Sequence, residues 1–89
     1  MKDYDFDKLK AALDEGHQWP CEYVFKFVVP NNEEKVEAVL SLLQGTEISQ
    51  KKSKTGKYIS FTGKAFVSDS QYIVDTYRKA SKIEGLLSL

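Results

Sequence analysis

The chain has 89 residues, of which 42% are hydrophobic and 29% are charged. This composition is typical of one small globular domain, and it excludes a disordered tail, a collagen-like chain and a membrane protein. Thirteen basic and thirteen acidic residues cancel, so the net charge gives the molecule no overall attraction to nucleic acid or acidic membranes.

The first predicted element is a short helix over residues 5–15. Asp5 or Asp7 can cap its start, and Gly16 can end it. Its apolar stripe would consist of Phe6, Leu9, Ala12 and Leu13. Because the N-terminal segment is acidic and lacks an apolar run, we expect no signal peptide there.

A strand over residues 21–29 follows, bracketed by Pro20 and Pro30. Its side chains alternate between two faces, as they do in a strand of which one side is buried. One face would carry Cys21, Tyr23, Phe25, Phe27 and Val29, and the other Glu22, Val24, Lys26 and Val28.

A second helix is predicted to begin at Asn31 as its N-cap, with Glu34 completing a capping box and Gly45 as its stop. The residues at helical spacing are Val36, Val39, Leu40 and Leu43. We predict a second strand over residues 46–52, with little apolar content.

A turn over residues 53–56 predicts a hairpin that returns through a third strand over residues 58–67. The inner face of this strand would carry Ile59, Phe61, Gly63, Ala65 and Val67, and the outer face Tyr58, Ser60, Thr62, Lys64 and Phe66.

The third predicted helix begins with a capping box of Ser68 and Gln71 and runs to about Lys82. Its buried stripe would consist of Ile73, Val74, Tyr77 and Ala80. We expect the apolar stretch over residues 85–89 to form a closing strand.

These elements predict an α+β fold of the ferredoxin-like βαββαβ type over residues 19–89, with a helical extension over residues 1–18. Two interleaved right-handed crossovers would give a four-stranded antiparallel sheet with two helices on one face. The second and fourth strands would be edges, and the apolar edge at Leu86 to Leu89 suits pairing between two subunits of a homodimer.

Residues 51–64 contain five lysines and no acidic residue, the most uneven charge distribution in the chain. The lysines are Lys51, Lys52, Lys54, Lys57 and Lys64. Such a cluster can bind phosphate or another anion. The alternative interpretation is a solvated turn beside an edge strand that its lysines protect from aggregation.

Two nucleotide-binding patterns are weak here. Gly56-Lys57 lacks the earlier glycine and the following serine or threonine of a phosphate-binding P-loop. Tyr58 lies on the outer face of its strand, as aromatic residues that stack on bases do, but the first strand offers no outward aromatic residue.

No combination of residues suggests catalysis, so we expect neither an enzyme nor a cofactor. A single cysteine, Cys21, and a single histidine, His17, cannot form a disulfide or a zinc site. The acidic pairs lie at predicted helix starts, where they favour the helix dipole. A cytoplasmic location is the simplest expectation for a chain with one cysteine.

Several short motifs together resemble the YbeD-like family of small bacterial proteins. They cover about residues 19–89 and are Trp19-Pro20, Lys26, the run SKTGKY at residues 53–58, Ser60, Thr62, Tyr77 and Lys82-Ile83. The resemblance implies a ferredoxin-like domain similar to the ACT regulatory domains, which bind small molecules, often amino acids, at subunit interfaces. It also implies a link to lipoate metabolism, suggested for one branch of the family. The chain has Pro30-Asn31-Asn32 where amino-acid-binding ACT domains have a glycine-bearing loop.

We therefore expect a non-enzymatic regulatory or adaptor domain that binds a small anionic ligand or a protein partner. The residues expected to bind it are Lys26, Lys54, Lys57, Tyr58 and Lys64. The alternative is a nucleic-acid-binding module that uses the same sheet face and the lysine-rich hairpin. Neither interpretation involves a membrane.

Overall fold

Three helices and four strands make up residues 5–88, the part of the chain that the computed structural model describes. In chain order they are α1 (Phe6–Gly16), β1 (Cys21–Pro30), α2 (Glu33–Leu42), β2 (Glu47–Lys52), β3 (Tyr58–Val67), α3 (Ser70–Ala80) and β4 (Leu87–Ser88). Residues 1–4, part of the acidic N-terminal segment, and Leu89, which we predicted in the last strand, lie outside the described residues.

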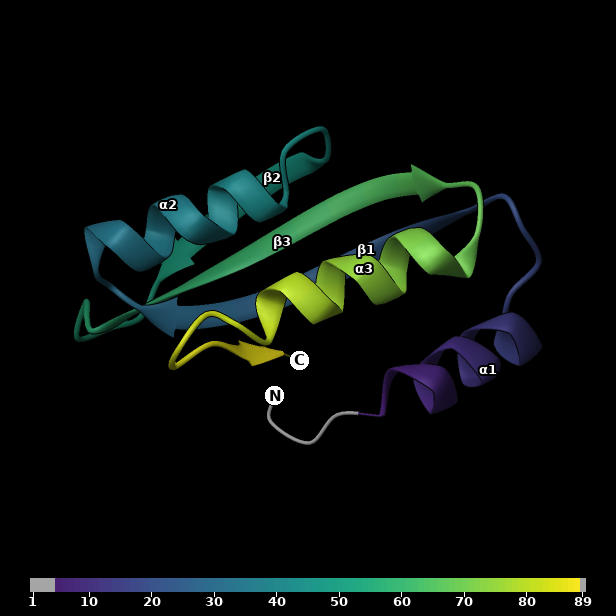
Figure 1. Ribbon diagram of the computed structural model, residues 1–89. Helices are drawn as coiled ribbons and strands as arrows, with labels where there is room; N and C mark the ends of the chain where they lie inside the picture. Colours follow the sequence, from purple (N-terminus) through teal and green to yellow (C-terminus); the bar gives the residue numbers. More distant parts are fainter. Residues whose placement is uncertain (1–4, 89) are drawn as a thin grey trace.

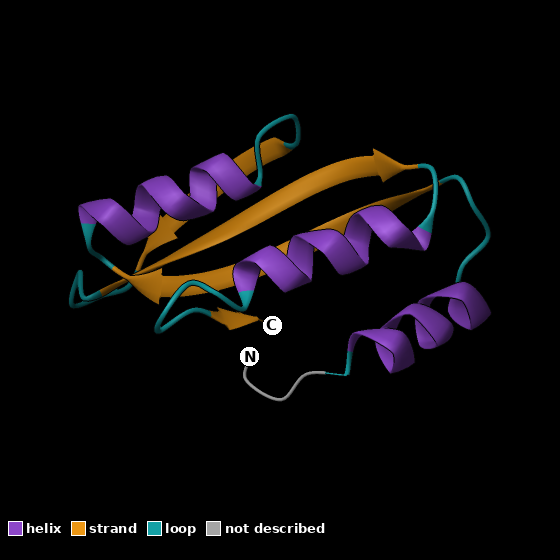
Figure 2. Ribbon diagram, in the orientation of Figure 1, coloured by secondary structure: helices purple, strands orange, loops and turns teal. Residues whose placement is uncertain are grey.

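The strands form one antiparallel sheet in the order β2-β3-β1-β4, which confirms the predicted four-stranded antiparallel sheet and the α+β class. β1 and β3 pair along their whole length, from Cys21 opposite Val67 to Pro30 opposite Tyr58. Figure 1 shows α2 and α3 lying side by side over one face of this sheet. The same layers are visible by secondary structure in Figure 2.

The core lies between this face and the two helices. Phe25, Phe27 and Val29 of β1 are fully buried, while Val24 before Phe25 and Lys26 between the two phenylalanines are exposed, which confirms the predicted alternation. The helices contribute fully buried Val39, Leu43 and Ile73. A row of aromatic rings joins the two layers: Phe25 and Phe27 both lie edge-on to Tyr77 of α3.

Gly63 of β3 allows the chain after α2 to approach the sheet closely. It lies opposite Phe25 on the core-facing side of the strand. A Cβ atom at this position would lie 2.9 Å from Cδ2 of Leu43, well inside van der Waals contact. Because Leu43 is itself fully buried, its side chain has little space in which to move.

α1 packs against α3 on the side away from α2 (Figure 1). Asp5 caps it by accepting a hydrogen bond from the Lys8 backbone N–H at 3.0 Å. Leu13 is buried in the common core, but Ala12, which we placed on the apolar stripe, is exposed. Trp19 Nε1 donates to the Asp14 carboxylate at 3.1 Å and thereby ties the connection before β1 back to α1.

The predicted caps of the other two helices are wrong by one residue. Asn32, not Asn31, caps α2, and its Oδ1 accepts from the backbone N–H of Glu34 at 2.9 Å. Asp69, not Ser68, caps α3 through the Tyr72 backbone N–H at 3.3 Å. An aspartate carboxylate is a strong acceptor at this position, so the helix begins after it.

Three element ends also differ from the prediction. α3 ends at Ala80 rather than Lys82, because Ile83 N–H turns back to the Ala80 carbonyl at 3.0 Å and closes a tighter turn. β2 begins at Glu47 rather than Thr46, because the Thr46 N–H donates to the Leu43 carbonyl at 3.0 Å and is not available to the sheet. Among the described residues, β4 comprises Leu87–Ser88, so Gly85 and Leu86 precede the strand.

The close approach at Gly63 predicts that Gly63→Ala lowers the free energy of unfolding by about 1–3 kcal/mol, because the new methyl group overpacks the contact with Leu43. Chemical denaturation measures this. Gly16→Ala is the matched control, since nothing lies within 4 Å of the added atom there. In a double-mutant cycle, Leu43→Val should relieve part of the Gly63→Ala penalty. Strict additivity of the two changes would contradict the contact.

Candidate functional site

The sheet face opposite α2 and α3 carries a mixture of lysine and apolar side chains. Tyr58 and Phe66 of β3 are 47% and 75% exposed on this face, and Val24 of β1 is also exposed. Lys26 lies opposite Thr62, and Lys64 lies opposite Val24. The predicted outer face is therefore confirmed in its composition.

The lysine-rich hairpin between β2 and β3 is closed by one serine. Ser53 donates its backbone N–H to the Tyr58 carbonyl at 2.9 Å, and its Oγ accepts from the Tyr58 N–H at 3.2 Å. Gly56 has φ +74°, a left-handed conformation that favours glycine in a tight turn. The turn thus holds Lys54 at a defined position beside the start of β3.

Asn31, which directly follows β1, holds this turn through two hydrogen bonds. Its Nδ2 donates to the Gly56 carbonyl at 2.9 Å, and its backbone N–H donates to the Lys57 carbonyl at 2.8 Å. This is the physical reason that Asn31 does not cap α2, since its amide is already used by the hairpin. The loop after β1 and the lysine hairpin are therefore one connected unit.

A pocket of about 240 Å³ opens beside the turn. It combines three lysines, two serines, an aromatic ring and one apolar side chain: Lys51, Lys52, Lys54, Ser53, Ser60, Tyr58 and Val28. No acidic residue is among those lining residues. Ammonium groups and hydroxyl groups can donate hydrogen bonds to an anion, and Tyr58 with Val28 can contact an apolar portion of the same molecule.

Only part of the predicted site lies at this pocket. Lys54 and Tyr58 line it, whereas Lys26, Lys57 and Lys64 are not among its lining residues. Lys64 instead approaches Glu22 of β1, with Nζ 3.9 Å from the carboxylate. The expectation that these five residues form a binding site stays a prediction.

Five lining residues are outside the set of five that we expected to bind, namely Val28, Lys51, Lys52, Ser53 and Ser60, although Lys51 and Lys52 belong to the lysine cluster identified from the sequence. The hairpin register was the available signal, because it places Lys51 opposite Ser60, and β1–β3 pairing places Val28 opposite Ser60. Ser60 also donates its hydroxyl to the Lys51 carbonyl at 3.3 Å.

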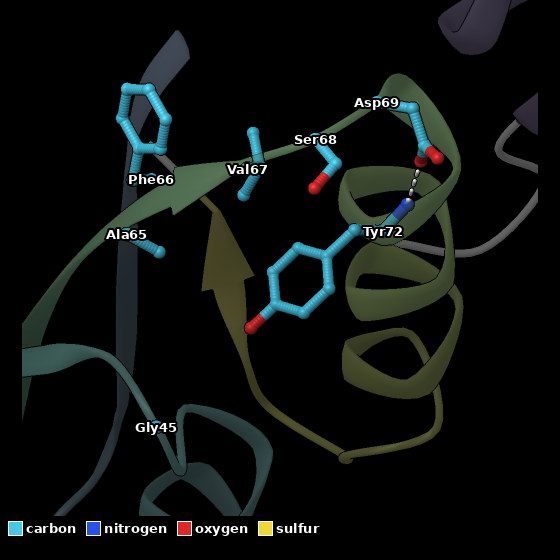
Figure 3. Close-up of a pocket in the computed structure, with 7 residues that line it drawn as sticks. All are labelled: Gly45, Ala65, Phe66, Val67, Ser68, Asp69 and Tyr72. Carbon is cyan, nitrogen blue, oxygen red and sulfur yellow. Dashed lines mark hydrogen bonds between the residues drawn. The ribbon is translucent and has the colours of Figure 1, made fainter. Parts of the chain in front are cut away.

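A second, larger pocket of about 450 Å³ lies where β3 leaves the sheet and α3 begins. Figure 3 shows Tyr72 reaching from α3 toward the end of β3, with Asp69 bonded to the Tyr72 backbone. Gly45, Ala65, Phe66, Val67 and Ser68 complete its lining. No pattern in the sequence indicates this pocket, because it brings Gly45, before β2, beside residues 65–72 at the end of β3 and the start of α3. Its one ionisable acidic group, Asp69, already caps α3, and no lysine lines it.

The single histidine contacts its neighbours in α1 and the following loop, and the single cysteine lies half-buried at the start of a strand. His17 Nδ1 lies 3.1 Å from the Leu13 carbonyl oxygen, and its ring stacks on Trp19 with centroids 5.4 Å apart. Cys21 is a half-buried free thiol at the start of β1. Within residues 5–88, no three histidine, cysteine or acidic side chains are grouped as metal ligands would be, and no helix has the length and apolar character needed to cross a membrane.

The link through Asn31 predicts that Asn31→Ala loosens the hairpin without harming the helix. The Nδ2 bond to Gly56 is lost, so hydrogen exchange at the backbone amides of residues 54–57 should accelerate. Asn32→Ala is the matched control, because it removes the α2 cap and should cost about 1 kcal/mol of stability. Unchanged hairpin exchange in Asn31→Ala, or equal acceleration in both variants, would contradict the link.

Comparison with known proteins identifies the family. The family model described as "Protein of unknown function (DUF493)" matches residues 14–88, nearly all of the part of the chain described above. Searches of curated proteins and of solved structures found no match. The match agrees with the resemblance to YbeD-like proteins drawn from the sequence motifs. The chain belongs to the DUF493 family.

Proposed function

We propose that this chain is a non-enzymatic regulatory or adaptor domain that binds a small anionic ligand at the pocket beside the lysine hairpin. The observation that carries the proposal is the lining of that pocket, which includes Lys51, Lys52 and Lys54 and no acidic residue. In a molecule with no net charge, this is a local positive potential rather than a general one.

The pocket favours an anion that also has an apolar portion. Lysine ammonium groups are compact point charges that suit a carboxylate or a phosphate. Val28 and the exposed ring of Tyr58 supply the apolar contact. Ser60 adds a hydroxyl that can turn toward a ligand or remain on the Lys51 carbonyl.

A ferredoxin-like, ACT-like arrangement is part of this proposal. It is supported by the strand order β2-β3-β1-β4, in which α2 and α3 each join two strands separated by one other strand. Such a sheet leaves one face open for a ligand or a protein partner. We also propose a cytoplasmic location, which the unpaired thiol of Cys21 supports.

Nucleic acid is the weaker candidate for this face. Tyr58 and Phe66 both lie on the outer side of β3, but they are eight positions apart along the strand, about 26 Å at the usual rise. That spacing does not let the two rings stack on neighbouring bases. We propose nucleic-acid binding only as the alternative, to be distinguished by its dependence on salt.

The proposal predicts that at least one small anion raises the unfolding temperature. The panel comprises lipoate, phosphosugars, nucleotides, amino acids and a short RNA. A ligand at 100 times its dissociation constant adds about 2.7 kcal/mol, which is about 10 °C or more for a chain of this size. Thermal unfolding with and without each compound measures the shift.

Two double variants, each of which removes two positive charges, test whether the shift depends on the pocket lysines. Lys51→Gln with Lys54→Gln should abolish the shift, while Lys8→Gln with Lys82→Gln should retain it. A flat panel would contradict the small-anion proposal, as would equal loss in both double variants. A shift from RNA alone that disappears with added salt would favour the nucleic-acid alternative instead.

A further inference from the structure

β2 forms an open edge of the sheet. All six of its residues, Glu47–Lys52, are exposed, and its only strand partner within residues 5–88 is β3. Figure 1 shows β2 as the outermost strand on the side of the sheet away from α1. An edge of this kind presents unpaired backbone donors and acceptors to whatever lies beside it.

The hydrogen-bond alternation identifies which backbone groups are free. The hairpin closes with the Ser53 N–H on the Tyr58 carbonyl, so the odd-numbered residues of β2 point their backbone groups at β3. The backbone groups of Ile48 and Gln50 therefore point away from the sheet, toward the open edge.

Two opposite charges flank the centre of this strand on its outer face. Glu47 and Lys51 lie two residues to either side of Ser49, and all three side chains point to the same face. Neither charge has a salt bridge within residues 5–88. Lys64, the residue opposite Glu47 on β3, has its ammonium near Glu22 instead.

We propose that β2 pairs with β2 of a second copy of this chain, antiparallel about a twofold axis at Ser49. In this register Glu47 of each copy lies opposite Lys51 of the other, so the strand is complementary to itself. Ile48 and Gln50 of the second copy then meet the free backbone groups of Gln50 and Ile48. From the sequence we expected both outer strands to be edges and pairing between subunits at the apolar C-terminal edge, whereas this charge pattern favours β2.

Lysines on an edge strand usually prevent pairing with another chain, but here the position of Lys51 favours one register of pairing over the others. A lysine directly opposite another lysine destabilises a ladder, whereas opposite charges stabilise it. A twofold axis at Lys51 would put that ammonium against its own copy, and an axis at Gln50 would place Glu47 opposite Ser53. Of these registers, only the axis at Ser49 pairs both carboxylates with both ammonium groups.

The pairing also covers an exposed apolar side chain. Ile48 is 37% exposed at the rim of the helix-covered face. About the axis at Ser49 the two copies of Ile48 are diagonal neighbours on that face, within reach of each other. The pairing does not require a bound anion: Glu47 and Ser49 do not line the lysine pocket, although Lys51 belongs to both surfaces.

Charge exchange tests the register in the full chain. Sedimentation equilibrium should show the wild type moving from a 10.1 kDa monomer to a species of twice that mass with rising concentration. Glu47→Lys and Lys51→Glu should each raise the dissociation constant tenfold or more, and the double exchange should restore it. A wild type that stays monomeric up to about millimolar concentration overturns the proposal, as does a double exchange that fails to restore association.

A cross-link distinguishes this interface from other dimers. Ser49 lies opposite itself as a non-hydrogen-bonded pair, with Cα atoms about 4.5 Å apart, close enough for a disulfide. In a Cys21→Ser background, Ser49→Cys should form a covalent dimer under mild oxidation. Thr62→Cys, one strand further from the axis on the same face, should not. Equal cross-linking of both variants, or none of Ser49→Cys, would overturn the proposed axis.

Discussion

The pairing of β1 with β3 in a single register is the constraint on which the rest of the structure depends. The two strands match over ten residues each, from Cys21 opposite Val67 to Pro30 opposite Tyr58. A slip of one residue would move every side chain to the other face. The register therefore determines both faces of the sheet at once. The phenylalanines of β1 face the helices, and Lys26, Tyr58 and Lys64 face outward.

The same ladder places the loop after β1 beside the lysine hairpin. Asn31 follows the last pair of the ladder, and its two hydrogen bonds reach Gly56 and Lys57 in the turn. This turn determines where Lys54 lies relative to Tyr58 and Val28 at the pocket. We infer that the core organises the candidate site indirectly, because the ladder orients one loop and that loop holds the hairpin.

The sequence predicted what depends on local periodicity and missed what depends on distant contacts. Alternation alone identified both long strands and assigned their faces, since a period of two has a single solution when one face is apolar. Asn31 and Asn32 are equivalent as capping residues in the sequence, and only a bond to Gly56, 25 residues away, decides between them. Lysine density suggested a site, yet of the five residues we named only Lys54 and Tyr58 line the pocket.

The central claim is that the pocket beside the lysine hairpin binds an anion with an apolar portion, and a titration with phenyl phosphate tests it directly. Nuclear magnetic resonance of the ¹⁵N-labelled chain should show saturable shifts at residues 51–54, Tyr58 and Ser60, with phenol producing none at the same concentrations. Shifts that do not saturate, that phenol reproduces, or that occur instead at Gly45 and Tyr72 of the larger pocket would contradict it.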